Sequence, residues 1–204
     1  MFSKVFSRLS ILLLIPSSLG AVIDIDAPAA TNVIDLGYAT YQGSFNQNTT
    51  NTQFLGIRFA APPTGTLRWR EPQQPATIAG VQLANEFPNR CLAGDRGNSP
   101  KSPFRMTNST IQSRDLEKRA VPPFSEDCLF LNVWVPGTLN QAKNLPVVVF
   151  IHGGGYARGS ASGLSGNDTF DGNDLIREAG GGVVAVTIQY RLGVFGFLAG
   201  QKLA

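Results

Sequence analysis

The sequence predicts an α/β protein with a central, mostly parallel sheet. Three short apolar runs rich in β-branched residues are typical of strands buried on both faces: CLFLNVWV (128–135), PVVVFI (146–151) and GGVVAVTIQY (181–190). A helical segment separates the second run from the third, which is the order of a strand, a crossover and a parallel strand. With 43% apolar and 15% charged residues among 204, the chain has the composition of an ordinary globular protein.

The first twenty residues do not belong to that core. Lys4 and Arg8 precede an apolar run over residues 9–15. The small residues Ser18 and Gly20 then fit a cleavage site after Gly20. Because the apolar run is shorter than the roughly 20 residues of a membrane span, we expect a secretory signal peptide over residues 1–20 and no transmembrane segment. An uncleaved anchor is the alternative. Without those two basic residues the formal net charge falls from +3 to +1. The charge therefore gives no indication of a nucleic-acid partner.

The remaining elements follow in chain order. Residues 33–45 and 53–59 predict two strands of a small hairpin, separated by the polar stretch QNTTNT. The segment from 91 to 128 is the most polar of the chain and predicts an exposed loop. Residues 173–179 predict a helix, with Asp171 or Asn173 as its cap and three glycines at 180–182 as its end.

Two further features agree with secretion into an oxidising compartment. Asn48, Asn108 and Asn167 each begin an N-x-Thr or N-x-Ser acceptor for N-glycosylation. Cys91 and Cys128 form an even pair, for which a disulfide is the natural interpretation. Such a bridge would contribute about 4 kcal/mol before strain is subtracted. Two unpaired buried thiols are the alternative.

A glycine-rich turn follows the second apolar run and contains the chain's one histidine, His152, before Gly153, Gly154 and Gly155. Glycines expose backbone N–H groups that can donate to an anionic oxygen. The P-loop pattern fails because Ser160 stands where lysine is required, and the dinucleotide pattern fails at Arg158. HGGG matches the oxyanion turn of lipases and esterases, although a turn chosen only for tightness is the alternative.

Four blocks in a fixed order indicate a family. They are FLGIRFAAPPTGTLRWREPQQP, SEDCLFLNVWVP, PVVVFIHGGGYARGS and VVAVTIQYRLGVFGFLAG, over residues 54–200. The chain resembles type B carboxylesterases and lipases, the group that also holds cholinesterases and secreted fungal lipases. The resemblance implies an α/β-hydrolase fold with a small N-terminal antiparallel hairpin, of which residues 21–204 form the N-terminal part.

The resemblance also implies roles for particular residues. The N–H groups of Gly154 and Gly155 would be oxyanion donors, and His152 and Gly153 would support their loop. A Cys91–Cys128 disulfide and an Arg68–Glu126 ion pair would hold the cysteine loop. A surface arginine without a partner is the alternative for Arg68.

The family's mechanism is acyl transfer through a serine that a histidine and an acidic residue activate. No G-x-S-x-G elbow is found, because the nearest match around Ser165 has Asn167 in place of the last glycine. We therefore expect no catalytic triad in this chain and the triad beyond Ala204, in a truncated or partial sequence. A secreted, non-catalytic, cholinesterase-like interaction protein and an enzyme with another constellation are the alternatives.

The expected substrates are small-molecule or lipid esters. Choline esters are disfavoured because neither tryptophan, Trp69 or Trp134, lies in the cysteine loop, where cholinesterases carry the tryptophan that faces the quaternary cation. One histidine and two paired cysteines cannot supply a tetrahedral zinc site, so we expect no metal and no cofactor. The sequence does not specify acyl length or oligomeric state.

Overall fold

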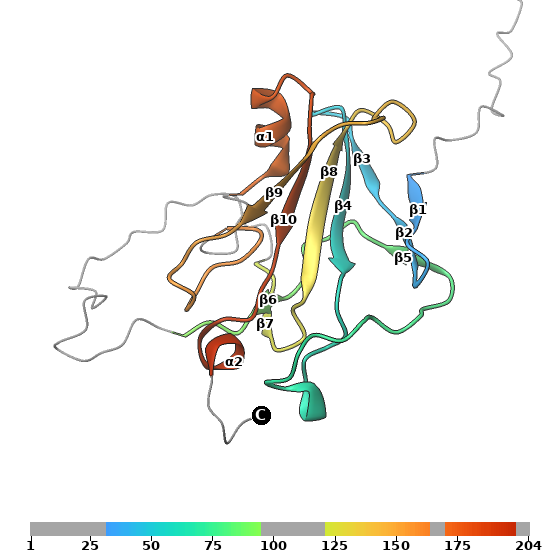
Figure 1. Cartoon of the computed structure of the whole chain (residues 1–204). Coiled ribbons are helices and arrows are strands. Elements are labelled where there is room, and N and C mark those ends of the chain that lie inside the picture. The colour runs from blue at the N-terminus through green and yellow to red at the C-terminus, as the bar shows by residue number, and fades with distance from the viewer. Residues whose placement is uncertain (1–31, 95–120, 164–169, 199–204) are drawn as a thin grey trace, which may run out of the picture.

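The computed structural model describes residues 32–94, 121–163 and 170–198. This part of the chain forms a five-stranded central sheet, a three-stranded sheet beside it, and a two-stranded ribbon at one end (Figure 1). The predicted signal peptide, Ser165, Asn108 and Asn167 lie outside the described residues.

The central sheet has the strand order β3-β4-β8-β10-β9. Its strands are β3 (Ser44–Asn46), β4 (Asn51–Arg58), β8 (Phe130–Pro136), β9 (Val147–Ile151) and β10 (Val184–Ile188). The smaller sheet contains β1 (Val33–Asp35), β2 (Thr40–Gln42) and β5 (Val81–Leu83), and the ribbon contains β6 (Arg90–Cys91) and β7 (Phe124–Ser125). The helical elements are the 3-10 turn η1 (Gly65–Leu67), α1 (Gly172–Glu178) and α2 (Gly193–Phe197).

The central sheet of the described residues is mixed, so the prediction of a mostly parallel sheet does not hold for this part of the chain. Only β9 and β10 pair in parallel, whereas β3–β4, β4–β8 and β8–β10 are antiparallel. The crossover through α1 brings the chain back to start β10 beside β9 in the same direction. The connection over residues 137–146 reverses the chain between β8 and β9. Because β10 lies between these two strands, it is parallel to one and antiparallel to the other.

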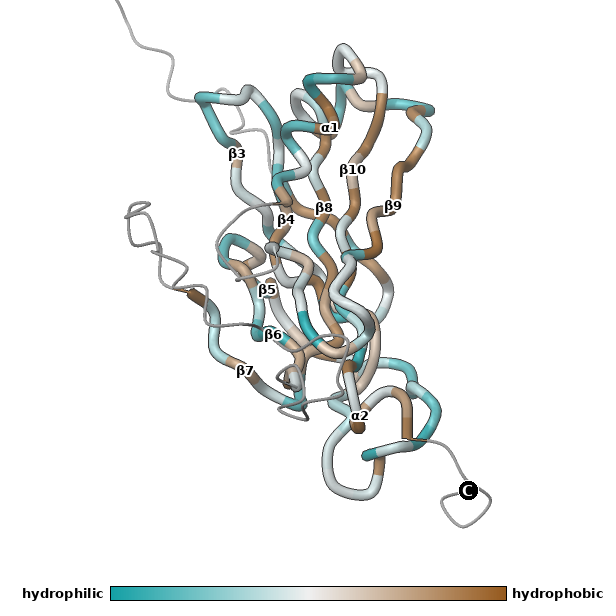
Figure 2. The backbone as a smooth tube through the Cα atoms, turned by 90° about the vertical axis from the view of Figure 1, so that its left-hand side faces the viewer, coloured by the Kyte–Doolittle hydropathy of each residue, from teal (hydrophilic) through white to brown (hydrophobic). Residues whose placement is uncertain are grey.

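Strand β9 is also less buried than its apolar sequence predicts. Val147, Val149 and Ile151 are 59%, 52% and 63% exposed, although we expected burial on both faces. Among the described strands β9 pairs only with β10, which leaves its other edge without a partner. In Figure 2 the hydrophobic colour follows β9 and β10 alike. Hydropathy alone therefore does not distinguish a central strand from an edge strand.

The N-terminal hairpin is shorter than predicted. The segment 33–45 is divided among β1, β2 and the start of β3, and only β3 forms the hairpin with β4. The divisions fall at glycines: Gly37 has φ = 83°, and a Cβ at Gly43 would lie 2.5 Å from the carbonyl oxygen of Gln53. These backbone requirements break a run that periodicity alone joins.

One buried polar side chain links three neighbouring strands of the central sheet. Asn132, fully buried on β8, donates to Thr187 Oγ1 on β10 and accepts from the backbone N–H of Gly56 on β4. Gly56 has φ = 86° and lies at the irregularity in the β4–β8 register between Leu55 and Ile57. Asn132 thus satisfies a β4 amide that the bulge removes from the ladder.

Helix α1 covers one face of this sheet and agrees with the predicted segment. Asp171 caps it by accepting from Asn173 N–H at 2.9 Å, and Gly180, with φ = 59°, follows its last turn. Its first residue, Gly172, lies against the indole of Trp134, which a Cβ there would overlap. Ile176 joins Trp134, Leu55 and Ala185 in a buried cluster between helix and sheet.

Helix α2 and the β6–β7 ribbon were not predicted. The ribbon forms at the two ends of the segment that we expected to be an exposed loop, where Cys91 pairs with Ser125 in register. Residues 95–120 within that segment are outside the described part. The two short strands lie at the end of the sheet where α2 also lies (Figure 1).

Candidate active site

Two loops meet at the carboxyl ends of β9 and β10, the edge of an α/β sheet where ligands usually bind. The first, residues 152–163, directly follows β9 and is called the glycine loop below. The second runs from β10 through Arg191 into α2. They are joined where Gly193 N–H donates to the carbonyl of Tyr156 at 2.7 Å.

A tight turn forms the front of the glycine loop. The N–H groups of Ala157 and Arg158 both donate to the carbonyl oxygen of Gly154, each at 3.3 Å. The two central residues have positive φ, 64° at Gly155 and 58° at Tyr156, as in a type I′ turn. Gly154 itself has φ = 130°. The backbone therefore takes conformations here that residues with a Cβ rarely adopt.

The glycines of the loop are not equivalent. A Cβ on Gly154 would overlap the carbonyl oxygen of Arg158. A Cβ on Gly159 would lie 2.5 Å from the oxygen of Gly153 and 2.6 Å from His152 Nδ1. By contrast, a Cβ on Gly153 meets nothing within 4 Å. Only the first two positions are closed to a side chain by neighbouring atoms.

The turn leaves two adjacent backbone donors available. No acceptor among the described residues receives a hydrogen bond from the N–H of Gly154 or Gly155. Gly155 is exposed and Gly154 is half-buried. Two neighbouring N–H groups without internal acceptors can donate together to one anionic oxygen.

His152 directly precedes this turn and is buried. The side chain is 2% exposed, and its Nδ1–H donates to the carbonyl of Gly153 at 2.9 Å, since a carbonyl can only accept. Its ring stacks on Tyr190 with 4.4 Å between centroids, and the Tyr190 hydroxyl donates to the His152 carbonyl at 2.6 Å. His152 and Gly153 therefore pack next to the turn, and the imidazole supports the turn structurally.

Burial lowers the pKa of His152 from its ordinary 6.5, and the hydrogen bond to Gly153 offsets this in part. The imidazole is therefore neutral, with its proton on Nδ1. Its Nε2 is buried and has no partner among the described residues. Burial likewise raises the pKa of Tyr190, with a smaller effect from Tyr156, so its hydroxyl stays protonated and can donate. The loop is held by neutral groups.

The rear of the glycine loop is held by buried amide and hydroxyl groups. Gln189, at the end of β10, accepts from Ala161 N–H at 3.1 Å and donates to the carbonyl of Asn89 at 3.3 Å. Ser160 donates to the carbonyl of Gly163 at 2.7 Å. Gln189 thereby links this loop to the segment that leads into Cys91. The sequence analysis did not assign a role to Gln189 or Tyr190, although both stand at the end of the predicted strand run 181–190.

The residues just before β8 are held by a disulfide and two ion pairs, together called the disulfide clamp below. Cys91 and Cys128 are joined, with 5.0 Å between their Cα atoms. Arg68 binds Glu126 through two hydrogen bonds of 2.6 and 2.7 Å, which raises the pKa of Arg68. Arg58 binds Asp127 in the same bidentate way, at 2.6 and 2.8 Å.

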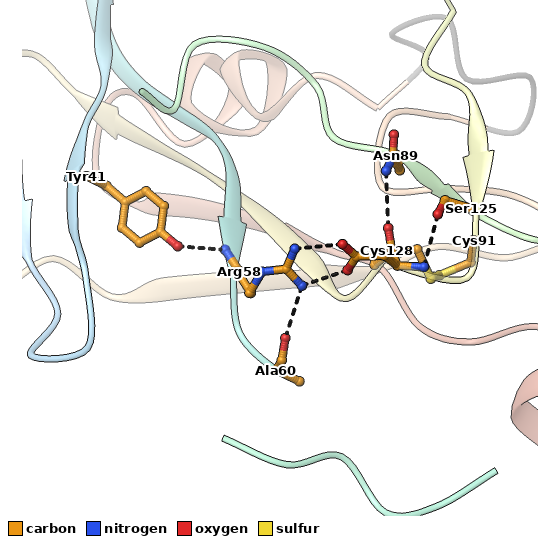
Figure 3. A network of polar contacts seen from close by, with 8 residues as sticks. Tyr41, Arg58, Ala60, Asn89, Cys91, Ser125 and Cys128 are labelled. Atoms are coloured by element: carbon orange, nitrogen blue, oxygen red, sulfur yellow. Dashed lines mark hydrogen bonds and ion pairs between the residues drawn. A yellow bond between two sulfur atoms is a disulfide. The ribbon is translucent and has the colours of Figure 1, made fainter. Parts of the chain in front are cut away.

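The Arg58–Asp127 pair is the member that sequence analysis missed. Figure 3 shows Arg58 reaching from the end of β4 toward the residues just before Cys128. Its guanidinium lies 4.4 Å from the centroid of Phe130, and its backbone N–H donates to the Tyr41 hydroxyl. The basic residue at the end of an apolar strand, with the acidic pair Glu126-Asp127 before Cys128, was the available signal.

Arg191, in the second loop, lies beside the clamp. Its Nη1 is buried and has no partner among the described residues. It lines a cavity of about 10 Å³ together with Arg68, Glu126 and the disulfide. Within the described residues, the Nη1 donor group of Arg191 is therefore unused.

Among the described residues no group of three or more histidine, cysteine or acidic side chains could hold a metal ion. The helices of this part of the chain are all too short to cross a membrane. The described histidine and serines do not form a nucleophile and base pair, since His152 Nε2 has no partner.

Comparison with known proteins settles the family. The model of the carboxylesterase family matches residues 30–203. The chain belongs to the carboxylesterase family. Among curated relatives, it is 41% identical over 152 residues to the medium-chain fatty acyl-CoA hydrolase precursor of Anas platyrhynchos, covering 74% of this chain and 24% of the relative. It is 36% identical over 189 residues to acetylcholinesterase-1 of Trittame loki, covering 88% and 30%.

Solved structures of similar proteins confirm the predicted α/β-hydrolase fold. EstA of Aspergillus niger is 38% identical with a TM-score of 0.63, over 85% of this chain and 28% of that one. A thermophilic pNB esterase is 29% identical with a TM-score of 0.64, over 83% and 30%. The chain thus spans between about a quarter and a third of the length of these relatives. The resemblance to type B carboxylesterases inferred from the four sequence blocks is confirmed.

Proposed function

We propose that this chain forms the oxyanion-binding part of a secreted serine hydrolase that cleaves carboxylic esters. A serine oxygen would attack the ester carbonyl carbon, and negative charge would develop on the carbonyl oxygen. The alcohol then leaves, and water hydrolyses the acyl-serine. The glycine loop would bind the developing oxyanion.

The two adjacent N–H groups of Gly154 and Gly155 carry this proposal. They follow β9 at the carboxyl edge of the sheet, and the described residues offer them no acceptor. The turn fixes them before substrate arrives, so no reorganisation is needed as charge develops. Donors of this kind contribute about 3 to 4 kcal/mol of barrier lowering each in serine hydrolases.

The nucleophile, acid and base would come from residues that are not in this sequence. His152 is unsuited to be the base because its side chain is buried and its Nδ1–H is bonded to the Gly153 carbonyl. The substrates proposed are small-molecule or lipid carboxylic esters. Secretion is part of the proposal and rests on the first twenty residues and on the disulfide.

A serine-directed organophosphonate tests this proposal on the natural protein. The protein would be recovered from the medium of its native source and recognised by peptides of residues 32–94. We expect hydrolysis of p-nitrophenyl butyrate, loss of that activity on labelling, and a label on a serine outside the 204 residues. The intact mass is measured on the same sample after deglycosylation.

The same mass and labelling measurements can contradict the proposed enzyme. A protein with the mass of residues 21–204 that neither hydrolyses esters nor takes the label would rule out the enzyme. That outcome would support the alternative of a secreted interaction protein with an esterase fold.

A further inference from the structure

A groove lies at the end of the sheet opposite the glycine loop. The β3–β4 turn, the connection after β8 and the carboxyl end of α1 meet there (Figure 1). The groove has a volume of about 640 Å³ and is lined by Phe45, Asn48, Asn51, Gln141, Asn173 and Arg177, among others. The proposed esterase chemistry uses none of these residues.

Asn48 lies at the tip of the β3–β4 turn and begins the acceptor sequence Asn48-Thr49-Thr50. It is exposed, and the backbone N–H groups of Asn48 and Thr49 both donate to Asn46 Oδ1, at 3.0 and 3.4 Å. This arrangement fixes the turn through Asn46 and leaves the Asn48 side-chain amide without a partner among the described residues. Its Nδ2, the atom to which an N-linked sugar would be attached, is therefore free beside the groove.

The lining beyond Asn48 has the chemistry of a sugar site. Phe45, three residues before Asn48, is 41% exposed and lines the groove. Asn51 Nδ2 donates to Asn173 Oδ1 at 2.8 Å, which leaves Asn51 Oδ1 unused within the described residues. Gln141 accepts from Thr138 N–H, which likewise leaves its Nε2 as a donor. An aromatic face with amide groups beside it suits a ring that has both C–H and hydroxyl groups.

The charged groups at the groove do not oppose a neutral ligand. Arg177 is paired with Asp174 at 2.7 Å and with Glu178 at 3.5 Å, on the exposed side of α1. Burying these amides against an apolar ligand would leave hydrogen-bonding groups unsatisfied, which is costly. A neutral polyhydroxyl ligand satisfies them.

We propose that Asn48 is N-glycosylated and that the first N-acetylglucosamine lies in this groove against Phe45. The inference rests on secretion, which is part of the proposed function. In the step itself, Asn48 Nδ2 bonds to C1 of the sugar and loses a proton. The C1–oxygen bond to a lipid-linked pyrophosphate donor breaks, and the lipid pyrophosphate leaves. The attached sugar joins the β3–β4 turn to α1 and the β8–β9 connection.

Glycopeptide mapping of the protein from its native source tests occupancy. Trypsin yields one peptide that ends at Arg58 and contains Asn48 as its only acceptor asparagine. Enzymatic removal of the glycan in heavy-oxygen water should convert Asn48 to aspartate carrying the heavy isotope. An unmodified Asn48 beside a modified Asn108 or Asn167 would overturn the inference while secretion stands. An intracellular protein with all three unmodified would overturn secretion as well.

The rate of glycan release tests the seating in the groove. We expect release from Asn48 in the native protein to be about tenfold slower than in the denatured protein, as a local opening free energy of about 1.4 kcal/mol imposes. Equal rates would show that the sugar does not occupy the groove.

Variants at Phe45, in the full chain secreted from yeast, assign the effect to the ring. Phe45→Ser should abolish the slow release and Phe45→Tyr should keep it. Equal slowing in both variants would exclude the aromatic contact. Thr50→Ala should remove the modification and Thr50→Ser should retain it.

Discussion

The glycine loop and the disulfide clamp lie at the same end of the sheet but are held by different forces. The clamp uses a covalent bond and two bidentate ion pairs. The glycine loop uses a neutral histidine, a tyrosine hydroxyl, an amide and glycines closed to a side chain. Carboxylates near the loop would compete with a developing oxyanion for its N–H donors. The difference indicates that the clamp supports the site while the loop keeps its donors free.

The largest loss of stability is expected from the clamp's covalent bond. Replacing both Cys91 and Cys128 by serine should lower the free energy of unfolding by about 4 kcal/mol, because the closed loop spans 37 residues. Denaturant unfolding of the purified protein measures this. An unchanged midpoint would show that the ion pairs alone define the clamp.

The two ion pairs of the clamp should not be equal. Arg58→Ala should cost about 2 to 3 kcal/mol, because it breaks two charged hydrogen bonds at a side chain that is only 17% exposed. Arg68→Ala should cost less, since Arg68 is 37% exposed and solvent screens its pair. The same unfolding measurement compares them, and a larger effect at Arg68 would contradict the ranking.

A smaller effect is expected in the glycine loop from a single hydroxyl. Tyr190→Phe keeps the ring that stacks on His152 but removes the hydrogen bond to the His152 carbonyl. The free energy of unfolding should fall by about 1 kcal/mol. Tyr156→Phe is the matched control, because the Tyr156 side chain is 66% exposed and should change little. Equal effects would mean that the Tyr190 hydroxyl does not hold the loop.

The smallest effect is a dependence on pH that the neutral loop should show. Because burial lowers the folded pKa of His152 below 6.5, the unfolded chain binds the proton first. The contribution of the neutral His152 to the free energy of unfolding is then fully present above pH 6.5. It is lost as the pH falls from 6.5 toward the folded pKa.

His152→Asn isolates this effect, because the chain contains one histidine. Unfolding free energies measured from about pH 7 down to pH 5 should show a slope in the parent protein that is reduced in the variant. Identical slopes would place the imidazole in a solvated environment.

Sequence reasoning found the elements whose signal is local. The helix after Asp171, the three apolar strands and the HGGG turn follow from caps, hydropathy and glycines. Strand β9 shows the limit, because its exposure depends on which strand lies beside it and not on its own residues. Arg58 and Asp127 are 69 positions apart, and their pairing depends on the β4–β8 register. Gln189 and Tyr190 likewise act only through the loop that the fold places against them.

The comparison of Gly154→Ala with Gly153→Ala in the protein from its native source tests the central claim most directly. A methyl group overlaps Arg158 at position 154 but meets nothing at position 153. We predict that kcat/KM for a simple ester falls about 10²- to 10³-fold in Gly154→Ala and stays near the parent value in Gly153→Ala, with both proteins folded. Equal activity in the two variants would contradict the role of the glycine loop in binding the oxyanion.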